Sequence, residues 1–226
     1  MSLLDLNKFK LQFITNDKDE STCIEIVKKV LFGGCKWIQL RYKTENINND
    51  LTKIIEIAFK LKILCKQHDA VFIIDDYVDI CKEIGADGVH LGKNDSPIML
   101  AREILGNNVI IGGTANTLKD IINIYKQSAD YIGLGPFRFT KTKSNLDTIL
   151  GIDGYKEIKD NLNRLNIQVP IVAIGGIKIQ DIKNIMKVGV DGIAISGEIT
   201  NSVSPTHITK ELLLQIDNYN NKYNLE

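Results

Sequence analysis

Three polar residues alternate along one short segment of the chain. Gln39, Arg41 and Lys43 are separated by single residues, and alternate side chains of an extended strand point to the same side. Arginine binds phosphate oxygens through paired hydrogen bonds, and lysine adds a point charge. The apolar residues Trp37 and Ile38 come directly before them, which argues against a solvated, amphipathic edge. We therefore predict that this segment binds an anion such as a diphosphate.

Two carboxylates, Asp76 and Asp95, follow two consecutive β-branched segments. Magnesium in proteins is usually held by one or two carboxylates together with phosphate oxygens and water. The alternative is that Asp75 or Asp76 caps a helix that begins near Tyr77, a common use of aspartate. The cationic segment at residues 39–43 favours the metal–diphosphate interpretation.

Two glycine-containing turns and one polar loop predict further anion sites. Gly175 and Gly176 precede a helical pattern, and Ser196 and Gly197 end the next β-branched segment. Backbone N–H groups in such turns bind phosphate, although a tight turn alone also explains a glycine pair. The long polar loop at about residues 137–150 offers hydroxyl and ammonium groups for a second anion, or is simply solvated. The groups are those of Thr140, Thr142 and Lys143.

The elements that would position these residues alternate regularly. Short Ile- and Val-rich runs, mostly continuous in hydrophobicity, are typical of parallel strands buried on both faces. They lie at 11–15, 37–41, 71–75, 88–91, 109–112, 131–135, 171–174 and 193–196. Each is followed by a stretch with helical periodicity, as in the apolar stripe at residues 54–64.

Eight strands and eight helices predict an α/β fold, the TIM (β/α)8 barrel, with residues 1–226 as a single domain. A doubly wound sheet is the alternative, but it would need a glycine-rich turn after the first strand, and residues 14–19 contain no glycine. In the barrel, all the polar groups above would meet at the carboxyl ends of the strands. His90 is also at a strand end, where it either touches ligand or, as we favour, fills the barrel mouth.

The amino-acid composition argues against several classes of function. Lys and Arg number 28 and Asp and Glu also number 28, which argues against broad binding of nucleic acid or an anionic membrane. No apolar run approaches the roughly 18–20 residues of a membrane span. The four cysteines form no CxxC pair, and no signal-peptide pattern opens the chain, so we expect free thiols in a reducing cytoplasm.

Taken together, these segments resemble the thiamine-phosphate synthase family of TIM-barrel enzymes. The resemblance covers nearly the whole chain in order, and five segments carry it. They are residues 39–43, 74–76, 85–92, 130–136 with 140–143, and 173–177.

The resemblance implies a transferase reaction. An aminomethylpyrimidine diphosphate and a thiazole phosphate give thiamine phosphate and diphosphate; diphosphate leaves first, and the thiazole nitrogen captures the resulting cation. It implies Mg²⁺ as cofactor and small-molecule substrates, and it leaves a homodimer open. From the charge and hydropathy above, we expect neither nucleic acid nor membrane as partner.

The resemblance also assigns roles by position. Gln39, Leu40, Arg41, Tyr42 and Lys43 would bind the pyrimidine diphosphate together with Asp75 and Thr114, and Asp76 and Asp95 would hold Mg²⁺. Thr140, Thr142 and Lys143 would close over both substrates, and Gly176, Ser196 and Gly197 would bind the thiazole phosphate. Arg41, Lys43 and Lys143 would stabilise the leaving diphosphate.

Some residues depart from the family pattern. Asp75 stands where Asn is common, Lys93 where Gln is common, and Thr114 where Ser is usual, and the serine of residues 196–197 is displaced by one position. Two alternatives stay open. One is a metal-independent thiazole tautomerase, and the other is a non-catalytic phosphate-binding barrel.

Overall fold

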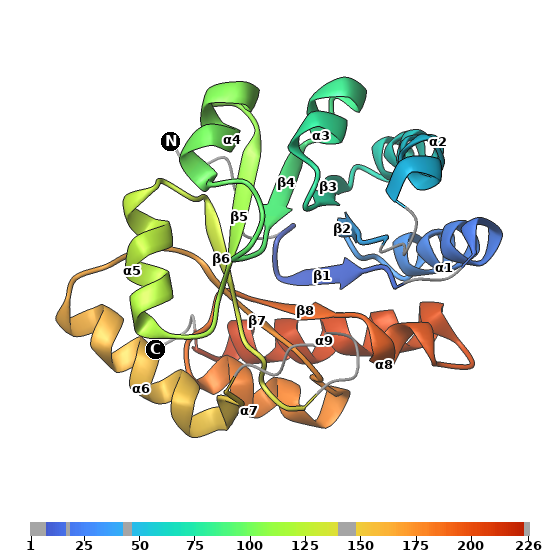
Figure 1. The fold of residues 1–226 in the computed structure, drawn as a ribbon. Helices are drawn as coiled ribbons and strands as arrows, with labels where there is room; N and C mark the ends of the chain where they lie inside the picture. The colour runs from blue at the N-terminus through green and yellow to red at the C-terminus, as the bar shows by residue number, and fades with distance from the viewer. Residues whose placement is uncertain (1–7, 17–18, 43–46, 140–147, 224–226) are drawn as a thin grey trace.

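Eight short parallel strands close into a barrel surrounded by helices (Figure 1). The computed structural model describes residues 8–16, 19–42, 47–139 and 148–223. The strands pair in sequence order and β8 pairs with β1, so the predicted TIM barrel is confirmed. They are β1 (Leu11–Ile14), β2 (Trp37–Leu40), β3 (Val71–Asp75), β4 (Gly88–Leu91), β5 (Ile110–Ala115), β6 (Tyr131–Leu134), β7 (Ile171–Ile174) and β8 (Gly192–Ile195).

Helices follow the strands as the periodicity predicts. They are α1 (Glu20–Phe32), α2 (Ile47–Gln67), α3 (Val78–Ile84), α4 (Ile98–Leu105), α5 (Leu118–Lys126), α6 (Gly151–Arg164), α7 (Ile182–Lys187), α8 (Gly197–Thr200) and α9 (Pro205–Tyr223). The short 3-10 helix η1 (Ile179–Asp181) leads into α7. The segment after β8 differs from the prediction of one helix, because the four-residue α8 comes before α9. Barrels of this class often carry such a short extra helix near a phosphate site.

The strand alternation divides the core into two parts. Outward-facing residues such as Ile38, Leu40 and Phe72 join the large cluster beneath the helices. Inward-facing residues such as Trp37, Ile73 and Ile110 fill the barrel itself. The ring of Trp37 makes an edge contact with that of Tyr131 at a centroid distance of 4.9 Å. The amino-terminal part of the barrel interior is therefore a packed apolar plug.

Polar side chains occupy the next part of the interior, towards the carboxyl ends of the strands. They are buried and inward-facing, and each comes from a different strand: Gln12, Gln39, Asp75 and His90. Buried polar groups need hydrogen-bond partners, so this layer must be internally bonded. It separates the apolar plug from the candidate site.

Two further predictions concern the thiols and the membrane. All four cysteines are buried and free, and burial raises the pKa of Cys35 to about 11. Among the described residues, no helix is long and apolar enough to cross a membrane.

Candidate functional site at the carboxyl ends of the strands

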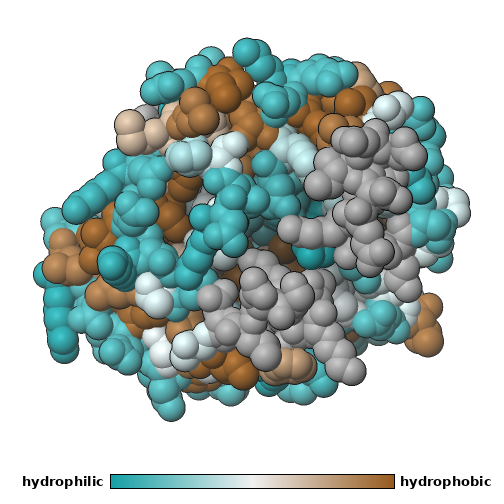
Figure 2. Space-filling view, in the orientation of Figure 1, coloured by the Kyte–Doolittle hydropathy of each residue, from teal (hydrophilic) through white to brown (hydrophobic). Residues whose placement is uncertain are grey.

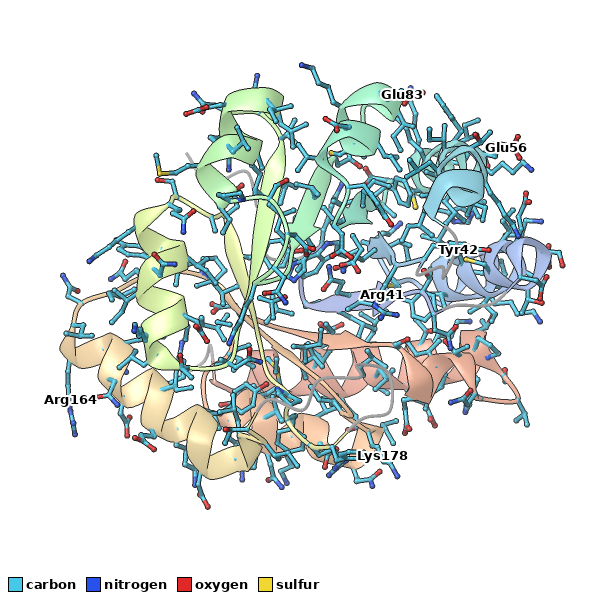
Figure 3. The ribbon with its side chains drawn as sticks, in the orientation of Figure 1. Arg41, Tyr42, Glu56, Glu83, Arg164 and Lys178 are labelled. Carbon is cyan, nitrogen blue, oxygen red and sulfur yellow. The ribbon has the colours of Figure 1, made fainter. Side chains whose placement is uncertain are left out.

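Arg41 is positioned by the end of β1. The Thr15 hydroxyl donates to the Arg41 carbonyl at 2.9 Å and accepts from the Arg41 N–H at 2.9 Å. This double contact extends the β1–β2 pairing by one residue beyond the strands, and so carries Arg41 to the barrel mouth. Figure 3 shows Arg41 near the middle of the molecule and Tyr42 farther out, towards α2. The Lys53 ammonium lies 5.7 Å from the Tyr42 ring centroid.

Asp75 forms an ion pair with Arg41. Arg41 Nε lies 3.7 Å from Asp75 Oδ2, with only 11% and 10% of the two side chains exposed. The Gln39 amide donates to Asp75 Oδ1 at 2.5 Å, and its oxygen accepts from Gln12 Nε2 at 2.9 Å. Gln39 therefore supports Asp75 from below, while the Leu40 side chain faces the outer core. Only the backbone of Leu40 is left to meet a ligand.

The two candidate metal ligands follow neighbouring strands. Asp76 has a left-handed backbone (φ 69°), which aspartate tolerates better than most residues. Its N–H donates to the His90 carbonyl at 2.9 Å, which ties the end of β3 to β4. Asp95 lies in the loop after β4, where its Oδ2 accepts from the Gly92 N–H at 2.6 Å. Helix α3 has Tyr77 as N-cap without a side-chain capping bond, so neither Asp75 nor Asp76 occupies the N-cap position.

Lys93 lies in the loop after β4 and contacts the first turn of α5. Its ammonium lies 2.8 Å from Asp120 Oδ2. Asp120 also accepts from the Asn116 and Thr117 N–H groups, which completes the predicted capping box of α5. Partial burial raises the pKa of Asp120, but the hydrogen bonds from Lys93, the Asn116 backbone and Thr117 outweigh burial and lower it. Asp120 is thus a carboxylate that orients Lys93.

A cavity of about 340 Å³ opens beside these loops, between the ends of β4 and β5 and the helices α4 and α5. Lys93, Asp95 and Thr114 are among the residues that line it. In the space-filling view, hydrophilic side chains gather around the middle of the same face (Figure 2). Asp95, a predicted metal ligand, and Thr114, a predicted diphosphate-binding residue, therefore border one space.

His90 lies under Thr114. Its Nε2 is 2.9 Å from Thr114 Oγ1, and its Nδ1 is 3.0 Å from the Tyr131 hydroxyl. The ring is 5% exposed. Filling the barrel mouth, the role favoured from sequence, is confirmed, but the ring also hydrogen-bonds a residue predicted to touch substrate.

The Gly175–Gly176 turn lies against the loop after β6. Both glycines have positive φ, and a Cβ on Gly176 would lie 2.6 Å from Arg138 Cγ. Arg138 donates to the Gly176 carbonyl and forms a two-point ion pair with Asp181. The two glycines are therefore explained by the tight turn and by the close approach of Arg138. The prediction that this turn binds phosphate needs separate support.

Such support comes from the next strand. Ser196 is the N-cap of α8, which Gly197 begins, but its side chain makes no capping bond. The Ser196 Oγ is buried and has no hydrogen-bond partner among the described residues. An unpaired buried hydroxyl is costly, and a ligand oxygen would satisfy it.

The family assignment comes from comparison of the whole chain with known proteins. The family model for thiamine monophosphate synthase matches residues 11–199, which span all eight strands. The chain belongs to the thiamine monophosphate synthase family.

Individual members agree with this assignment. Thiamine-phosphate synthase of Bacteroides thetaiotaomicron is 47% identical over 203 residues, covering 90% of this chain and 95% of that protein. The enzyme of Pyrococcus furiosus is 36% identical, with 91% and 94% coverage. A solved structure of thiamine phosphate pyrophosphorylase from P. furiosus superposes with a TM-score of 0.82 at 33% identity, covering 95% of this chain and 98% of that one.

Within this member of the synthase family, part of the predicted site lies outside the described residues. That part comprises Lys43, Thr140, Thr142 and Lys143. The described structure brings the remaining predicted residues to the carboxyl ends of β2–β5, β7 and β8.

Sequence reasoning missed two supports of the family site, Gln12 and Tyr131. A signal for each was present. Gln12 interrupts an otherwise apolar strand, which indicates a polar partner inside the barrel. For Tyr131 the signal is Gly112 on the neighbouring strand, where a Cβ would lie 2.2 Å from the tyrosine ring.

Proposed function

We propose that the chain is a thiamine-phosphate synthase, a transferase that joins an aminomethylpyrimidine diphosphate to a thiazole phosphate. The products are thiamine phosphate and diphosphate. The observation that carries the proposal is the arrangement at the ends of β2 to β4. A nearly buried Arg41 is held by Asp75, and the carboxylates Asp76 and Asp95 follow the ends of the neighbouring strands β3 and β4.

This arrangement suits a dissociative reaction. The bond between the pyrimidine methylene and the diphosphate oxygen breaks first, and the electron pair leaves with diphosphate. The thiazole nitrogen then donates its lone pair to the methylene carbon. No protein nucleophile is required, because catalysis depends on stabilising the leaving charge and aligning the acceptor. Arg41 and Lys43 from one predicted segment and Lys143 from another would supply that positive charge.

The donor set fits Mg²⁺. Among the described residues, no group of three or more His, Cys, Asp or Glu side chains is arranged to hold a metal. Magnesium needs only one or two carboxylates when phosphate oxygens and water complete its shell. Asp76 and Asp95 would hold it, and when bound it would neutralise charge on the diphosphate.

The second substrate needs a separate anion site. We assign its phosphate to Gly176, Ser196 and Gly197, because the buried Ser196 hydroxyl has no partner among the described residues. We assign the pyrimidine diphosphate to Asp75 and Thr114 together with Gln39, the Leu40 backbone and Tyr42, and Thr140 and Thr142 would complete the site. We further propose that the protein acts in the cytoplasm; a homodimer is compatible with this function.

The test is a product assay. Purified protein is incubated with both substrates and Mg²⁺, with a matched EDTA control, and diphosphate and thiamine phosphate are measured. Equimolar products that disappear with EDTA are expected. The absence of product from folded protein and intact substrates would refute the proposal.

Two other outcomes would identify the alternatives. Conversion between thiazole phosphate tautomers without any pyrimidine substrate would indicate a tautomerase. Tight binding of thiamine phosphate without turnover at any Mg²⁺ concentration would indicate a non-catalytic barrel.

A further inference from the structure

A chain of hydrogen bonds begins at Asp75 and runs across the barrel interior. A carboxylate only accepts, so the Gln39 amide nitrogen faces Asp75 (2.5 Å) and its oxygen faces Gln12. The Gln12 nitrogen therefore donates, to Gln39 Oε1 at 2.9 Å and to the Tyr131 hydroxyl at 3.4 Å. The carboxylate thus determines the orientation of both amides.

The chain continues from Tyr131 to the candidate site. The Tyr131 oxygen accepts from Gln12, and His90 Nδ1 lies 3.0 Å from it. A buried phenol proton needs an acceptor, and an accepting Nδ1 would provide one. A neutral imidazole that accepts at Nδ1 carries its proton on Nε2. Nε2 therefore donates to Thr114 Oγ1 at 2.9 Å. With its oxygen serving as acceptor, the Thr114 hydroxyl proton points away from His90, and Thr114 is one of the residues that line the cavity.

Glycines on β5 and β6 leave space for the rings of Tyr131 and His90. A Cβ on Gly112 would lie 2.2 Å from the Tyr131 ring and 2.6 Å from His90 Nδ1, and one on Gly133 would lie 3.1 Å from His90 Cε1. Burial also raises the pKa of Tyr131, which keeps the phenol protonated as a donor. Glycines on two strands therefore make the room in which His90 and Tyr131 meet.

We propose that His90 is a positioning residue that, as the neutral Nε2–H tautomer, directs the Thr114 O–H donor at the diphosphate of the substrate. The inference rests on the proposed function, because it assumes that Thr114 meets that diphosphate. If the tautomer were reversed, Thr114 would donate to His90 and present only lone pairs to an anion. In that arrangement the Tyr131 oxygen would accept from both Gln12 and His90, and the buried phenol proton would be left without an acceptor, which is costly.

A double-mutant cycle tests the coupling. Tyr131→Phe keeps the ring contact with Trp37 but removes the proton that holds the tautomer. We expect the KM for the pyrimidine diphosphate to rise about tenfold, the scale of one hydrogen bond to a charged group, with the KM for the thiazole phosphate unchanged. In a Thr114→Val background, Tyr131→Phe should have no further effect. Thr114→Ser retains a hydroxyl and should retain the sensitivity to Tyr131→Phe.

Tyr155→Phe is the matched control. This variant also removes a buried tyrosine hydroxyl, which bonds the Leu134 carbonyl, but on the outer side of the barrel. It should lower thermal stability without changing either KM. An equal effect of Tyr131→Phe in the wild-type and Thr114→Val backgrounds would overturn the inference, because the tyrosine would then act on structure alone.

The tautomer is read directly by ¹⁵N NMR of the histidine rings, with His90 assigned by the Tyr131→Phe spectrum. A pyridine-type Nδ1 and a pyrrole-type Nε2 are expected. The opposite tautomer or a charged ring would overturn the inference. If the Thr114→Val enzyme is active and its KM for the pyrimidine diphosphate is unchanged, the inference is overturned and the proposed function stands. An inactive wild type would refute the proposed function, while the spectrum still reports the tautomer.

Discussion

Arg41 and Asp75 face each other across neighbouring strands, with Arg41 Nε 3.7 Å from Asp75 Oδ2 and both side chains nearly buried. Asparagine is common at position 75 in the family that the sequence resembles. Here the extra negative charge is matched by the guanidinium, and Gln39 supplies an amide donor to the same carboxylate. The departure at Asp75 is therefore compensated within the site.

Asp75→Asn should impair binding of the pyrimidine diphosphate. The asparagine oxygen still accepts from Gln39, but the attraction that orients Arg41 is lost. We expect the KM for the pyrimidine diphosphate to rise about tenfold, equivalent to about 1.4 kcal/mol, with the fold intact. Steady-state kinetics measures the KM, and thermal unfolding tests whether the fold is intact. An unchanged KM would show that Asp75 does not position Arg41.

Asp76→Asn and Asp95→Asn should each lower activity by about 100-fold or more, the scale of lost electrostatic stabilisation of a transition state. In the latter, the asparagine oxygen can still accept from the Gly92 N–H, so the loop should persist. Binding of Mn²⁺ in the presence of diphosphate, followed by electron paramagnetic resonance, provides a readout apart from turnover. Asp153→Asn is the control, because the Asp153 side chain is fully exposed. Wild-type Mn²⁺ binding in both site variants would contradict the metal assignment.

Gly176→Ala should weaken binding of the thiazole phosphate. A Cβ there would lie 2.6 Å from Arg138 Cγ and 3.1 Å from the Phe139 carbonyl oxygen, so the loop after β6 must shift. We expect the KM for this substrate to rise about tenfold or more. Gly151→Ala is the matched control, since Gly151 has a similar φ of 57° but no atom within 4 Å of the added Cβ. It should cost about 1–2 kcal/mol of stability and leave the KM unchanged; equal KM effects would rule out the contact as the cause.

Acid should weaken the fold partly through Asp120. Its pKa is lowered in the folded protein, so its contribution is present above the unfolded-state value of 3.8 and is lost as pH falls through the lower, folded value. Asp120→Asn should therefore reduce the dependence of the unfolding free energy on pH in this acid range. Urea denaturation at a series of pH values between about pH 5 and pH 2 measures this pH dependence of the unfolding free energy. Identical slopes for the variant and the wild type would contradict the assignment.

Local patterns in the sequence predicted most of the fold. Continuous β-branched runs separated by amphipathic stretches require a parallel sheet covered by helices, and their number favours the closed barrel. The rule that chemistry gathers at the carboxyl ends of barrel strands then predicted one site that contains Arg41, Asp76, Asp95 and Thr114. The extra helix α8 was not predicted, because four residues are too few to display a helical period.

What the sequence by itself determined is the set of chemical groups and the strand on which each one lies. Only the tertiary structure decided how those groups are paired, because closing the barrel brings together side chains that are far apart in the chain. Gln12 and Tyr131 are 119 residues apart, and nothing in either segment alone indicates that a proton chain joins them. Lys93 likewise carries a charge that is evident from sequence, whereas its orientation depends on Asp120 in the first turn of α5.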